Sequence, residues 1–266
     1  MRAKYAADPE FQKHEALLDN GIDLARLTYP EVRTLRCQMQ YIFQDPYSSL
    51  NPRMTVANII GEGLLAHKYC KKANERMHEE ILQTMEDCGL APYFLHRYPH
   101  QFSGGQRQRI GIARSLAVHP KFVVCDEAVS ALDVSIQSQI INLLQDLKEQ
   151  QHLTYLFITH DLSVVKYISD RIGVMYLGNL VELADSQEIF DHPMHPYTEA
   201  LLESIPTTEE KRDLAVLEGD IPSPVNPPKG CKFHTRCHKC MEVCKYAAPE
   251  WAEIEPEHWC ACHLYD

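Results

Sequence analysis

The chain has 266 residues, 45% hydrophobic and 24% charged, which is the composition of a globular protein with an ordinary core. There are 26 Lys and Arg against 37 Asp and Glu, and the resulting net charge of −11 argues against a nucleic-acid-binding protein, which normally carries a basic surface. No apolar run approaches the ~20 residues of a membrane-spanning helix, and the first residues are too polar for a secretory signal peptide. We therefore expect a cytosolic protein, which would associate with a membrane only through a partner.

The N-terminal part of the chain predicts a few short elements. Residues 17–21 are expected to form a short strand ending in an Asn-Gly turn, and residues 30–37 a short helix. The bulky residues 38–44 predict a second strand, which an Asp-Pro pair terminates. The sequence QDPYSSLNPR that starts at Gln44 would, on its own, indicate only a loop with two prolines.

Residues 54–98 show helical periodicity and end in helix-breaking residues. Apolar side chains recur three and four positions apart, as one face of an amphipathic helix requires. They are Val56, Ile59, Ile60 and Leu64, followed by Ile81, Leu82, Met85 and Leu90. We expect a small helical subdomain here, with its charged residues on a solvated face.

A further helix is predicted to begin after Ser103. Ser103 is a favourable N-cap residue, and Gln106 three positions later completes a capping box. Gly104 and Gly105 would let backbone N–H groups approach an anion closely, and the helix dipole adds positive potential there. Taken alone, a capped amphipathic helix is more often structural than functional.

Two adjacent carboxylates follow a short apolar strand. Residues 122–125 suit a strand that is buried on both faces of a parallel sheet. Asp126 and Glu127 come at its carboxyl end, which is where open α/β sheets bind their ligands. The alternative interpretation is a pair of solvated acids that ends a strand.

Further elements alternate along the middle of the chain. Residues 136–147 predict an amphipathic helix, and residues 155–158 predict another buried strand. His160 lies just after this strand, and a single histidine in such a place is usually structural. Residues 171–177 and 180–183 flank a Gly-Asn pair, which indicates a β-hairpin.

The C-terminal part contains the sequence HPMHPYTEALL at 192–202, a proline-containing linker and six cysteines between Cys231 and Cys262. Such clustering in a reducing compartment suggests a metal site rather than disulfides. Spacing alone favours zinc, because Cys237 and Cys240 form a short chelating pair. The other four cysteines are interpreted as buried or incidental thiols. They are Cys37, Cys70, Cys88 and Cys125.

In their order along the chain, these motifs resemble those of the ATP-binding-cassette (ABC) ATPases. The segment after Gln44 resembles the Q-loop, FSGGQ at 102–106 the signature motif, VVCDE at 123–127 the Walker B strand, SALD at 130–133 the D-loop, and His160 the H-loop histidine. The signature motif usually begins with leucine where this chain has phenylalanine. The SLNPR and HPYTEALL segments resemble, more narrowly, the oligopeptide and dipeptide (nickel) importers.

The resemblance implies a role for each matching residue. Glu127 would orient or deprotonate the attacking water, His160 would contact the γ-phosphate and Glu127, and Gln44 would sense the magnesium ion and the water. Asp126 would hold Mg²⁺, often through water. The remaining residues act at the dimer interface: Ser103, Gly104, Gly105 and Gln106 would face ATP bound by the opposite subunit, and Asp133 would cross the interface.

The resemblance also changes the expectation for the cysteines. Peptide-importer ATPases often end in G-C-x-F-x-x-R-C, a further cysteine and a final A-C-H, and such cysteines can ligate a 4Fe–4S cluster. In this chain they are Cys231, Cys237, Cys244 and Cys262, which leaves Cys240 and Cys260 outside the pattern. Zinc and the absence of any metal remain alternatives.

The expected fold class is α/β: an incomplete RecA-like P-loop NTPase core with a helical subdomain and a cysteine-containing C-terminal extension. We expect core residues in 1–44, the helical subdomain with the signature motif in 45–118, further core in 119–190, and the extension in 191–266. The sequence contains no G-x-x-x-x-G-K-[ST] phosphate loop and no Gly-Lys dipeptide. We therefore expect an N-terminally truncated copy with some apolar surface left exposed.

The expected function is that of the ATP-binding and ATP-hydrolysing subunit of an oligopeptide or dipeptide importer, peripheral on the cytoplasmic side of the plasma membrane. Its partners would be a second ABC ATPase subunit, in a homo- or heterodimer, the membrane permease subunits and, indirectly, a peptide-binding protein; no nucleic acid is expected. One alternative is a catalytically incompetent, truncated relic that acts only as an interaction partner. The other is a soluble cassette ATPase that works on DNA or ribosomes.

Overall fold

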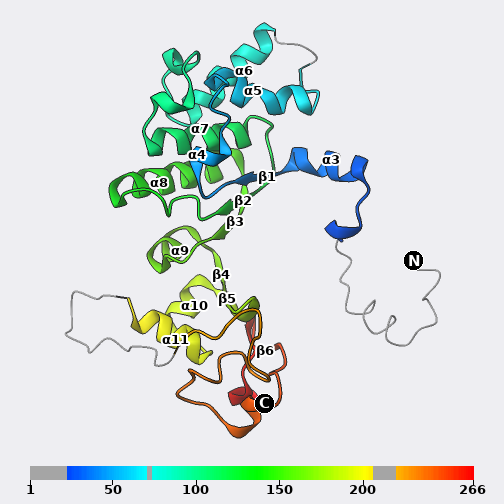
Figure 1. Cartoon of the computed structure of the whole chain (residues 1–266), viewed down its shortest axis with the longest axis vertical. Coiled ribbons are helices and arrows are strands. Elements are labelled where there is room, and N and C mark those ends of the chain that lie inside the picture. Colours follow the sequence, from blue (N-terminus) through cyan, green and yellow to red (C-terminus); the bar gives the residue numbers. More distant parts are fainter. Residues whose placement is uncertain (1–22, 71–73, 206–219) are drawn as a thin grey trace. The chain divides into compact units, whose positions relative to one another are not determined.

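The computed structural model describes residues 23–70, 74–205 and 220–266, so the strand predicted at 17–21 lies outside the described residues. Figure 1 shows the elements in chain order. They are η1 (Leu24–Arg26), α3 (Tyr29–Gln38), β1 (Met39–Ile42), α4 (Pro46–Ser49), α5 (Val56–Ala66), α6 (Glu75–Asp87), η2 (Pro92–Phe94), η3 (Pro99–Gln101), α7 (Gly104–Leu116), β2 (Phe122–Asp126), α8 (Val134–Gln151), β3 (Thr154–Ile158), α9 (Leu162–Ile168), β4 (Arg171–Tyr176), β5 (Asn179–Asp185), α10 (Ser186–Asp191), α11 (Pro196–Glu203), η4 (Glu242–Lys245), β6 (Ala252–Glu255), β7 (His258–Cys260) and η5 (His263–Tyr265).

The described residues divide into two compact units, which are treated separately below. The first comprises the residues up to Ile42, Pro46–Val124 and His152–Thr154. The second comprises Phe43–Asp45, Cys125–Gln151 and Tyr155–Asp266. The helices predicted between 54 and 98 and the signature helix therefore belong to the first unit. The Walker B carboxylates, the H-loop and the C-terminal part belong to the second.

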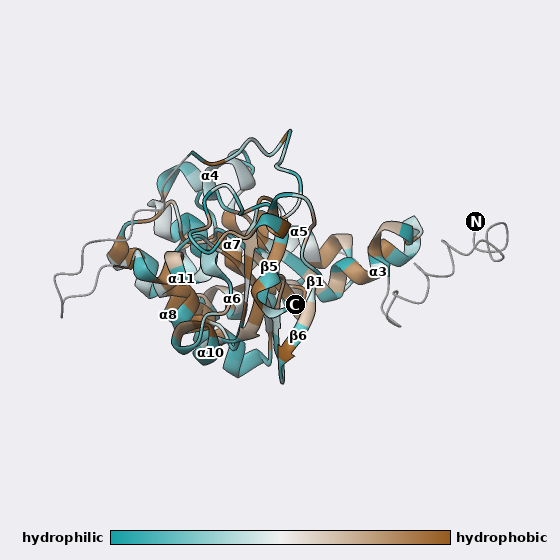
Figure 2. Cartoon of the chain, turned by 90° about the horizontal axis from the view of Figure 1, so that it is seen from below, coloured by the Kyte–Doolittle hydropathy of each residue, from teal (hydrophilic) through white to brown (hydrophobic). Residues whose placement is uncertain are grey.

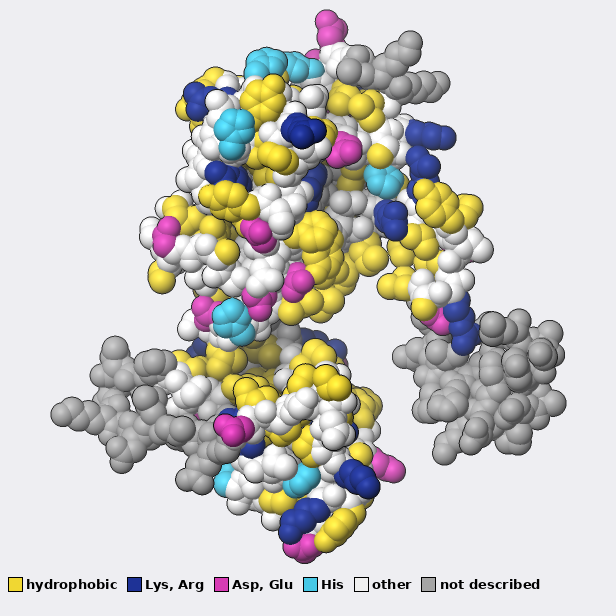
Figure 3. Space-filling model, in the orientation of Figure 1, with side chains coloured by type: hydrophobic (Ala, Val, Ile, Leu, Met, Phe, Trp, Pro, Cys, Tyr) yellow, Lys and Arg dark blue, Asp and Glu magenta, His cyan; other side chains and the backbone are white. Residues whose placement is uncertain are grey.

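The strands of the described residues form two sheets, and together with the helices they confirm the predicted α/β class. One sheet has three strands in the order β1-β2-β3, and the other has four in the order β4-β5-β7-β6. The prediction that β3 is a buried strand is wrong. Its side chains alternate between the two faces of the strand, and Leu156 and Ile158 on one face are 50% and 46% exposed. Hydrophobic side chains are accordingly visible at the surface in Figure 3.

The helical part of the first unit packs around α7. This helix contacts α4, α5, α6 and β1. It is buried on most of its surface, which is more than the single buried face of an amphipathic helix. Ile110 and Ile112 are fully buried, and the polar Arg107, Gln108 and Ser115 are buried with them. By contrast, α3 has no buried residue, and its ribbon alternates between hydrophilic and hydrophobic segments (Figure 2).

The predicted hairpin is confirmed as the antiparallel pair of β4 and β5. Its turn lies one residue earlier than the Gly-Asn signal suggested, because Asn179 pairs with Tyr176 in the ladder. The two connecting residues are Leu177 and Gly178, with φ of 44° and 78°. Two successive positive φ angles are the backbone of a type I′ turn, whose twist matches that of the flanking strands.

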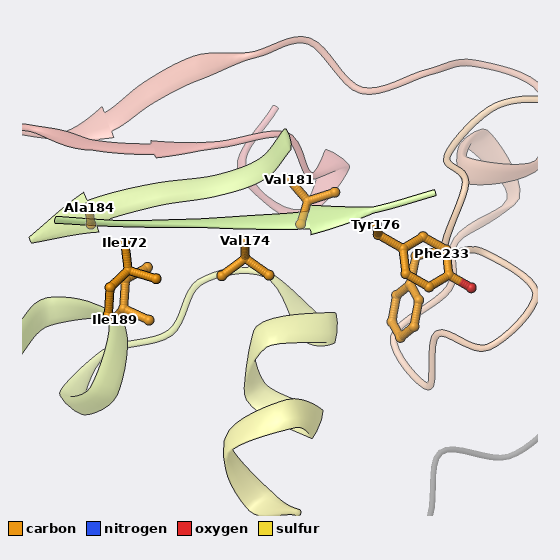
Figure 4. Packing of buried hydrophobic residues seen from close by; sticks show 7 residues of the cluster. All are labelled: Ile172, Val174, Tyr176, Val181, Ala184, Ile189 and Phe233. Atoms are coloured by element: carbon orange, nitrogen blue, oxygen red, sulfur yellow. The ribbon is translucent and has the colours of Figure 1, made fainter. Parts of the chain in front are cut away.

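The C-terminal tail completes the second sheet. Strand β7 pairs antiparallel with β5, placing Cys260 opposite Glu182, and β6 pairs with the other edge of β7. Buried side chains of β4 and β5 pack against residues of α10 and of the cysteine-containing segment in one cluster (Figure 4). Its members are Ile172, Val174, Tyr176, Val181, Ala184, Ile189 and Phe233. Phe233 comes from the cysteine-containing segment, so that segment contributes to the core of the second unit.

Helices of the length and apolar character needed to cross a membrane are absent from the described parts of the chain.

Candidate functional site

Glu127 lies directly after β2 in a left-handed backbone conformation, with φ of 43°. Its N–H donates to the Ile158 carbonyl at the end of β3 (2.9 Å). Its own carbonyl accepts hydrogen bonds from the N–H (3.1 Å) and the Oγ (3.0 Å) of Ser130. A non-glycine residue at positive φ costs about 1–3 kcal/mol and is concentrated at functional sites, where its surroundings hold it in place. These three bonds fix the backbone that carries the Glu127 carboxylate.

The two other residues predicted to be catalytic contact this same carboxylate. Gln44 Nε2 donates to Glu127 Oε2 at 2.5 Å, although the two residues are 83 positions apart. His160 Nδ1 lies 3.3 Å from Glu127 Oε1. The His160 side chain is 73% exposed and that of Glu127 is 28% exposed. The second unit therefore brings Gln44, Glu127 and His160 together, with the histidine ring facing solvent.

This arrangement has a defined chemical capacity. An ionised carboxylate only accepts hydrogen bonds, so Glu127 can accept the proton of a water molecule within hydrogen-bond reach. The Gln44 amide occupies one carboxylate oxygen and thereby restricts the orientation of the group. The His160 ring can exchange a proton with the other oxygen or donate to a bound anion. The three side chains can therefore position and activate a water molecule.

Asp126 ends β2 and precedes Glu127 in the chain. A carboxylate is the ligand type that Mg²⁺ prefers, and Mg²⁺ bound with nucleotides usually takes only one or two protein carboxylates, with waters and phosphate oxygens completing its shell. Within the described residues, no group of three or more His, Cys, Asp or Glu could hold a metal ion by itself. A single carboxylate at Asp126 fits a Mg²⁺ ion that arrives with phosphates.

Sequence reasoning missed the support that Asp161 gives to this site. Asp161 Oδ1 accepts from the N–H groups of Ser163 (2.9 Å) and Val164 (3.4 Å), so it caps α9, and Gln137 Nε2 on α8 donates to its Oδ2 (3.1 Å). Burial alone would raise the pKa of Asp161, but the Gln137 bond, the two backbone bonds and His160 together lower it. The signal was the aspartate that directly precedes an apolar helical stretch.

The start of α7 has the geometry that the sequence predicted. Gln106 N–H donates to Ser103 Oγ (3.4 Å), and Ser103 N–H donates to Gln106 Oε1 (3.2 Å), which confirms the capping box. Ser103 is exposed, while Gly105 is buried in the first unit. The positive end of the α7 dipole is therefore accessible at Ser103 and Gly104.

Asp133 occupies an exposed position at the start of α8. Its Oδ1 accepts from the Ile136 N–H (3.0 Å), and its carbonyl accepts from the Gln137 N–H (2.8 Å). Asp133 therefore caps this helix. Its predicted place at a dimer interface stays a prediction.

The segment after Gln44 contains the short helix α4 where a loop was the simplest expectation. Two arginines of α7 hold it in place. The Arg107 guanidinium carbon lies 3.6 Å from the centroid of the Tyr47 ring, a cation–π contact. Arg114 Nη1 donates to the Ser49 carbonyl (2.5 Å). The signature helix and the segment after the Q-loop are thus joined within the first unit.

Glu182 on β5 joins three parts of the second unit. It is fully buried, and its carboxylate accepts from the N–H groups of Met194 (2.6 Å) and His195 (3.1 Å) and from His258 Nε2 on β7 (2.8 Å). The HPYT segment packs in the same region, since the Tyr197 ring centroid lies 5.2 Å from that of Phe233. The two sequence motifs of the C-terminal part, HPYT and GCKF, therefore share one core.

His195 makes the stability of this region dependent on pH. Burial lowers its pKa from 6.5 to about 4, although Glu182 opposes the shift. Because the pKa of the folded state lies below that of the unfolded chain, the neutral ring stabilises the fold above pH 6.5, and this contribution is lost as the pH falls toward 4. We expect a loss of about 3 kcal/mol.

Unfolding in denaturant at pH 7 and at low pH, followed by tryptophan fluorescence, measures this loss. In the His195→Gln variant the stability should fall less over the same interval, because the other acids titrate alike in both proteins. Equal losses in the two proteins would contradict the role of His195.

The six C-terminal cysteines lie close enough to influence one another's pKa. Burial, assisted by neighbouring thiols, raises the pKa of Cys231, Cys237 and Cys262, that of Cys237 to about 11. Metal ligation needs thiolates. No three of these groups converge to hold an ion in the parts of the chain that the structure describes. In this arrangement the cysteines do not fit a 4Fe–4S cluster or a zinc ion. Cys231, Cys237, Cys244 and Cys262 therefore remain cluster ligands only by prediction.

Gly230 is required by the backbone at the start of the cysteine segment. Its φ is 66°, and a Cβ would collide with the Cys244 carbonyl oxygen and lie 3.0 Å from the Tyr246 nitrogen. We expect Gly230→Ala to lower the free energy of unfolding by roughly 3 kcal/mol. Gly178→Ala is the matched control, because its φ is 78° but a Cβ there meets no described atom within 4 Å.

Denaturant unfolding of the two variants checks this prediction. Gly178→Ala should cost only the backbone strain, about 1 kcal/mol. If both variants lose the same amount, the close approach at Cys244 contributes nothing.

Comparison with known families agrees with the motifs. The ABC transporter family model matches residues 8–130, and the model for the oligopeptide/dipeptide transporter C-terminal region matches residues 181–244. The oligopeptide transport ATP-binding protein AppF of Bacillus subtilis is 52% identical over 255 residues, which cover 94% of this chain and 77% of AppF. The oligopeptide transport ATP-binding protein OppF of Escherichia coli is 48% identical over 240 residues, covering 89% of this chain and 70% of OppF.

Solved structures give the same result for the fold. The ATP-binding cassette MJ0796, in a dimeric post-hydrolysis state with ADP and Pi, is similar with a TM-score of 0.55 and 28% identity over 64% of this chain and 72% of that one. The cbiO1 protein of Clostridium perfringens, part of an ABC transporter complex, also has a TM-score of 0.55, with 25% identity over 62% of this chain and 64% of cbiO1. The chain belongs to the ATP-binding proteins of ABC transporters, in the oligopeptide/dipeptide transporter family.

Proposed function

We propose that this chain is an ATP-binding and ATP-hydrolysing subunit of an importer of oligopeptides or dipeptides. ATP hydrolysis would drive peptide transport through permease subunits in the membrane. The chain would lie against them on the cytoplasmic side of the plasma membrane. A second ABC ATPase subunit would complete the nucleotide sites, and a separate peptide-binding protein would deliver the substrate.

The observation that carries the proposal is the convergence of Gln44 and His160 on the Glu127 carboxylate. Gln44, Glu127 and His160 follow three different strands, β1, β2 and β3. Activation of a water molecule beside a phosphate requires such side chains to lie next to one another. Asp126 would hold the Mg²⁺ ion, which neutralises phosphate charge when it is bound. Glu127 would accept a proton from the attacking water at its carboxylate, and Gln44 would orient that carboxylate.

The two halves of the chain's motif set would serve different nucleotides. In the family dimer, the signature motif of one subunit faces ATP held by the other. Ser103 and Gly104, with the dipole of α7 behind them, would approach the γ-phosphate of a partner's ATP. Glu127 and His160 would act with a phosphate-binding loop, a motif that the present sequence does not contain.

Purification of the tagged chain from detergent-solubilised membranes tests this proposal. We expect it to bring down integral membrane subunits and a second ABC ATPase subunit, and the assembly to hydrolyse ATP only when Mg²⁺ is present. An assembly that forms but neither binds nor hydrolyses Mg²⁺-ATP would favour the non-catalytic interaction protein. Isolation with ribosomes or DNA, without membrane subunits, would favour a soluble cassette ATPase.

The proposal uses no metal at the C-terminal cysteines. A 4Fe–4S cluster at Cys231, Cys237, Cys244 and Cys262 would be a separate property of the chain. Iron analysis and the visible absorption spectrum of an anaerobically purified sample decide it: a colourless sample without iron would remove the cluster and leave the ATPase proposal unchanged.

A further inference from the structure

A cysteine and a histidine meet in the first unit, away from the residues discussed so far. Cys37 Sγ, on α3, lies 2.9 Å from Nδ1 of His67, the residue that ends α5. Both side chains are partly exposed, so reagents in solution can reach the pair. The two residues are 30 positions apart, and the helices bring them together.

Two arginines place positive charge beside this pair. Arg33 and Arg36 are exposed on α3, and Arg33 Nη2 donates to the Ala66 carbonyl (2.7 Å), directly before His67. Burial, followed by the charges of these two arginines, lowers the pKa of His67. This favours the neutral form of the ring, whose Nδ1 can accept the thiol proton. The same positive charges attract anions to the pair.

We propose that Cys37 is a nucleophilic thiol and a site of modification by small anionic disulfides of the glutathione class. The Cys37 thiol gives its proton to His67 Nδ1, and the thiolate attacks one sulfur of the disulfide. The disulfide S–S bond breaks as a new S–S bond to Cys37 forms. The departing thiolate takes the proton from His67, so one thiol and one disulfide yield one mixed disulfide and one thiol.

The other thiols provide an internal contrast. Cys88 and Cys125 are fully buried, and burial raises the pKa of each to about 12. They lack both access and a thiolate at neutral pH, so they should react slowly. Cys37 combines access, a proton acceptor and positive charge. The sequence alone suggested a buried or incidental thiol at this position. These three features instead make Cys37 a specific site of reaction.

Timed reaction of the reduced full chain with glutathione disulfide, followed by peptide mass spectrometry, tests the proposal. We expect Cys37 to be modified at least about tenfold faster than Cys88 and Cys125, and His67→Gln to slow it about tenfold and move its pH profile upward. His78→Gln is the matched control, because His78 is exposed on α6 of the same unit. It should leave the rate unchanged.

A second reagent separates reactivity from charge attraction. Iodoacetamide is neutral, so Arg36→Gln should slow the reaction with glutathione disulfide more than the reaction with iodoacetamide. The proposal is overturned if Cys37 reacts no faster than the buried thiols, or if His67→Gln leaves both the rate and its pH profile unchanged. Circular dichroism of each variant shows that the fold is retained.

Discussion

Glu127→Gln is expected to lower ATP hydrolysis at the nucleotide site that this carboxylate serves about 10²–10⁴-fold, the range for loss of a general base. The amide has the shape of the carboxylate but cannot accept the proton of water at neutral pH. It can still meet Gln44 and His160, so the fold and the binding of nucleotide should change little. Phosphate release by the purified assembly at saturating Mg²⁺-ATP measures the effect.

The control for this prediction is Glu149→Gln. Glu149 is an exposed carboxylate on α8 of the same unit, so its replacement makes the same change of charge away from the site. It should leave hydrolysis at the wild-type rate. If Glu127→Gln hydrolyses ATP as fast as Glu149→Gln, this chain's carboxylate takes no part in the reaction, and the non-catalytic interpretation gains.

Glu182→Ala is expected to destabilise the C-terminal sheet by roughly 3–5 kcal/mol, because three hydrogen-bond donors around a buried carboxylate lose their acceptor at about 1–3 kcal/mol each. His258 would lose its buried partner, and the N–H groups of Met194 and His195 would lose their acceptor. A buried donor without an acceptor carries its full desolvation cost. The strand β7 and the HPYT segment should therefore detach more readily from β5.

Tryptophan fluorescence reports this loss directly. The chain's two tryptophans, Trp251 and Trp259, stack on each other with ring centroids 6.2 Å apart beside β6 and in β7. The midpoint of denaturant unfolding should fall in Glu182→Ala and stay near wild type in Glu188→Ala, because Glu188 is exposed on α10. A difference below about 1 kcal/mol between the two variants would show that Glu182 does not hold the sheet together.

The parts of the site that lie next to sequence signals could be predicted. Ser103 and Gln106 are three positions apart, so their capping box is a local pattern, and Glu127 follows an apolar strand that is visible in the sequence. The contact of His160 with Glu127 was expected only through the resemblance, and the hydrogen bond from Gln44 to Glu127 was not expected. Periodicity and spacing alone do not state which strand ends meet.

Contacts between distant residues without a periodic signal were not predicted. Glu182 and His258 are 76 positions apart, Gln137 and Asp161 are 24 apart, and each pair is one hydrogen bond made by tertiary packing. The burial of β3 was wrongly predicted for a related reason. An apolar strand shows that it suits a buried place, but not whether another element covers each of its faces.

The most direct test of the account is uptake of a labelled oligopeptide by cells in which the gene for this chain carries Glu127→Gln, compared with cells that carry Glu149→Gln and with the wild type. Immunoblotting establishes that the three proteins are present in equal amounts. We expect uptake to fall to background with Glu127→Gln and to stay at the wild-type rate with Glu149→Gln. Wild-type uptake with Glu127→Gln would contradict it.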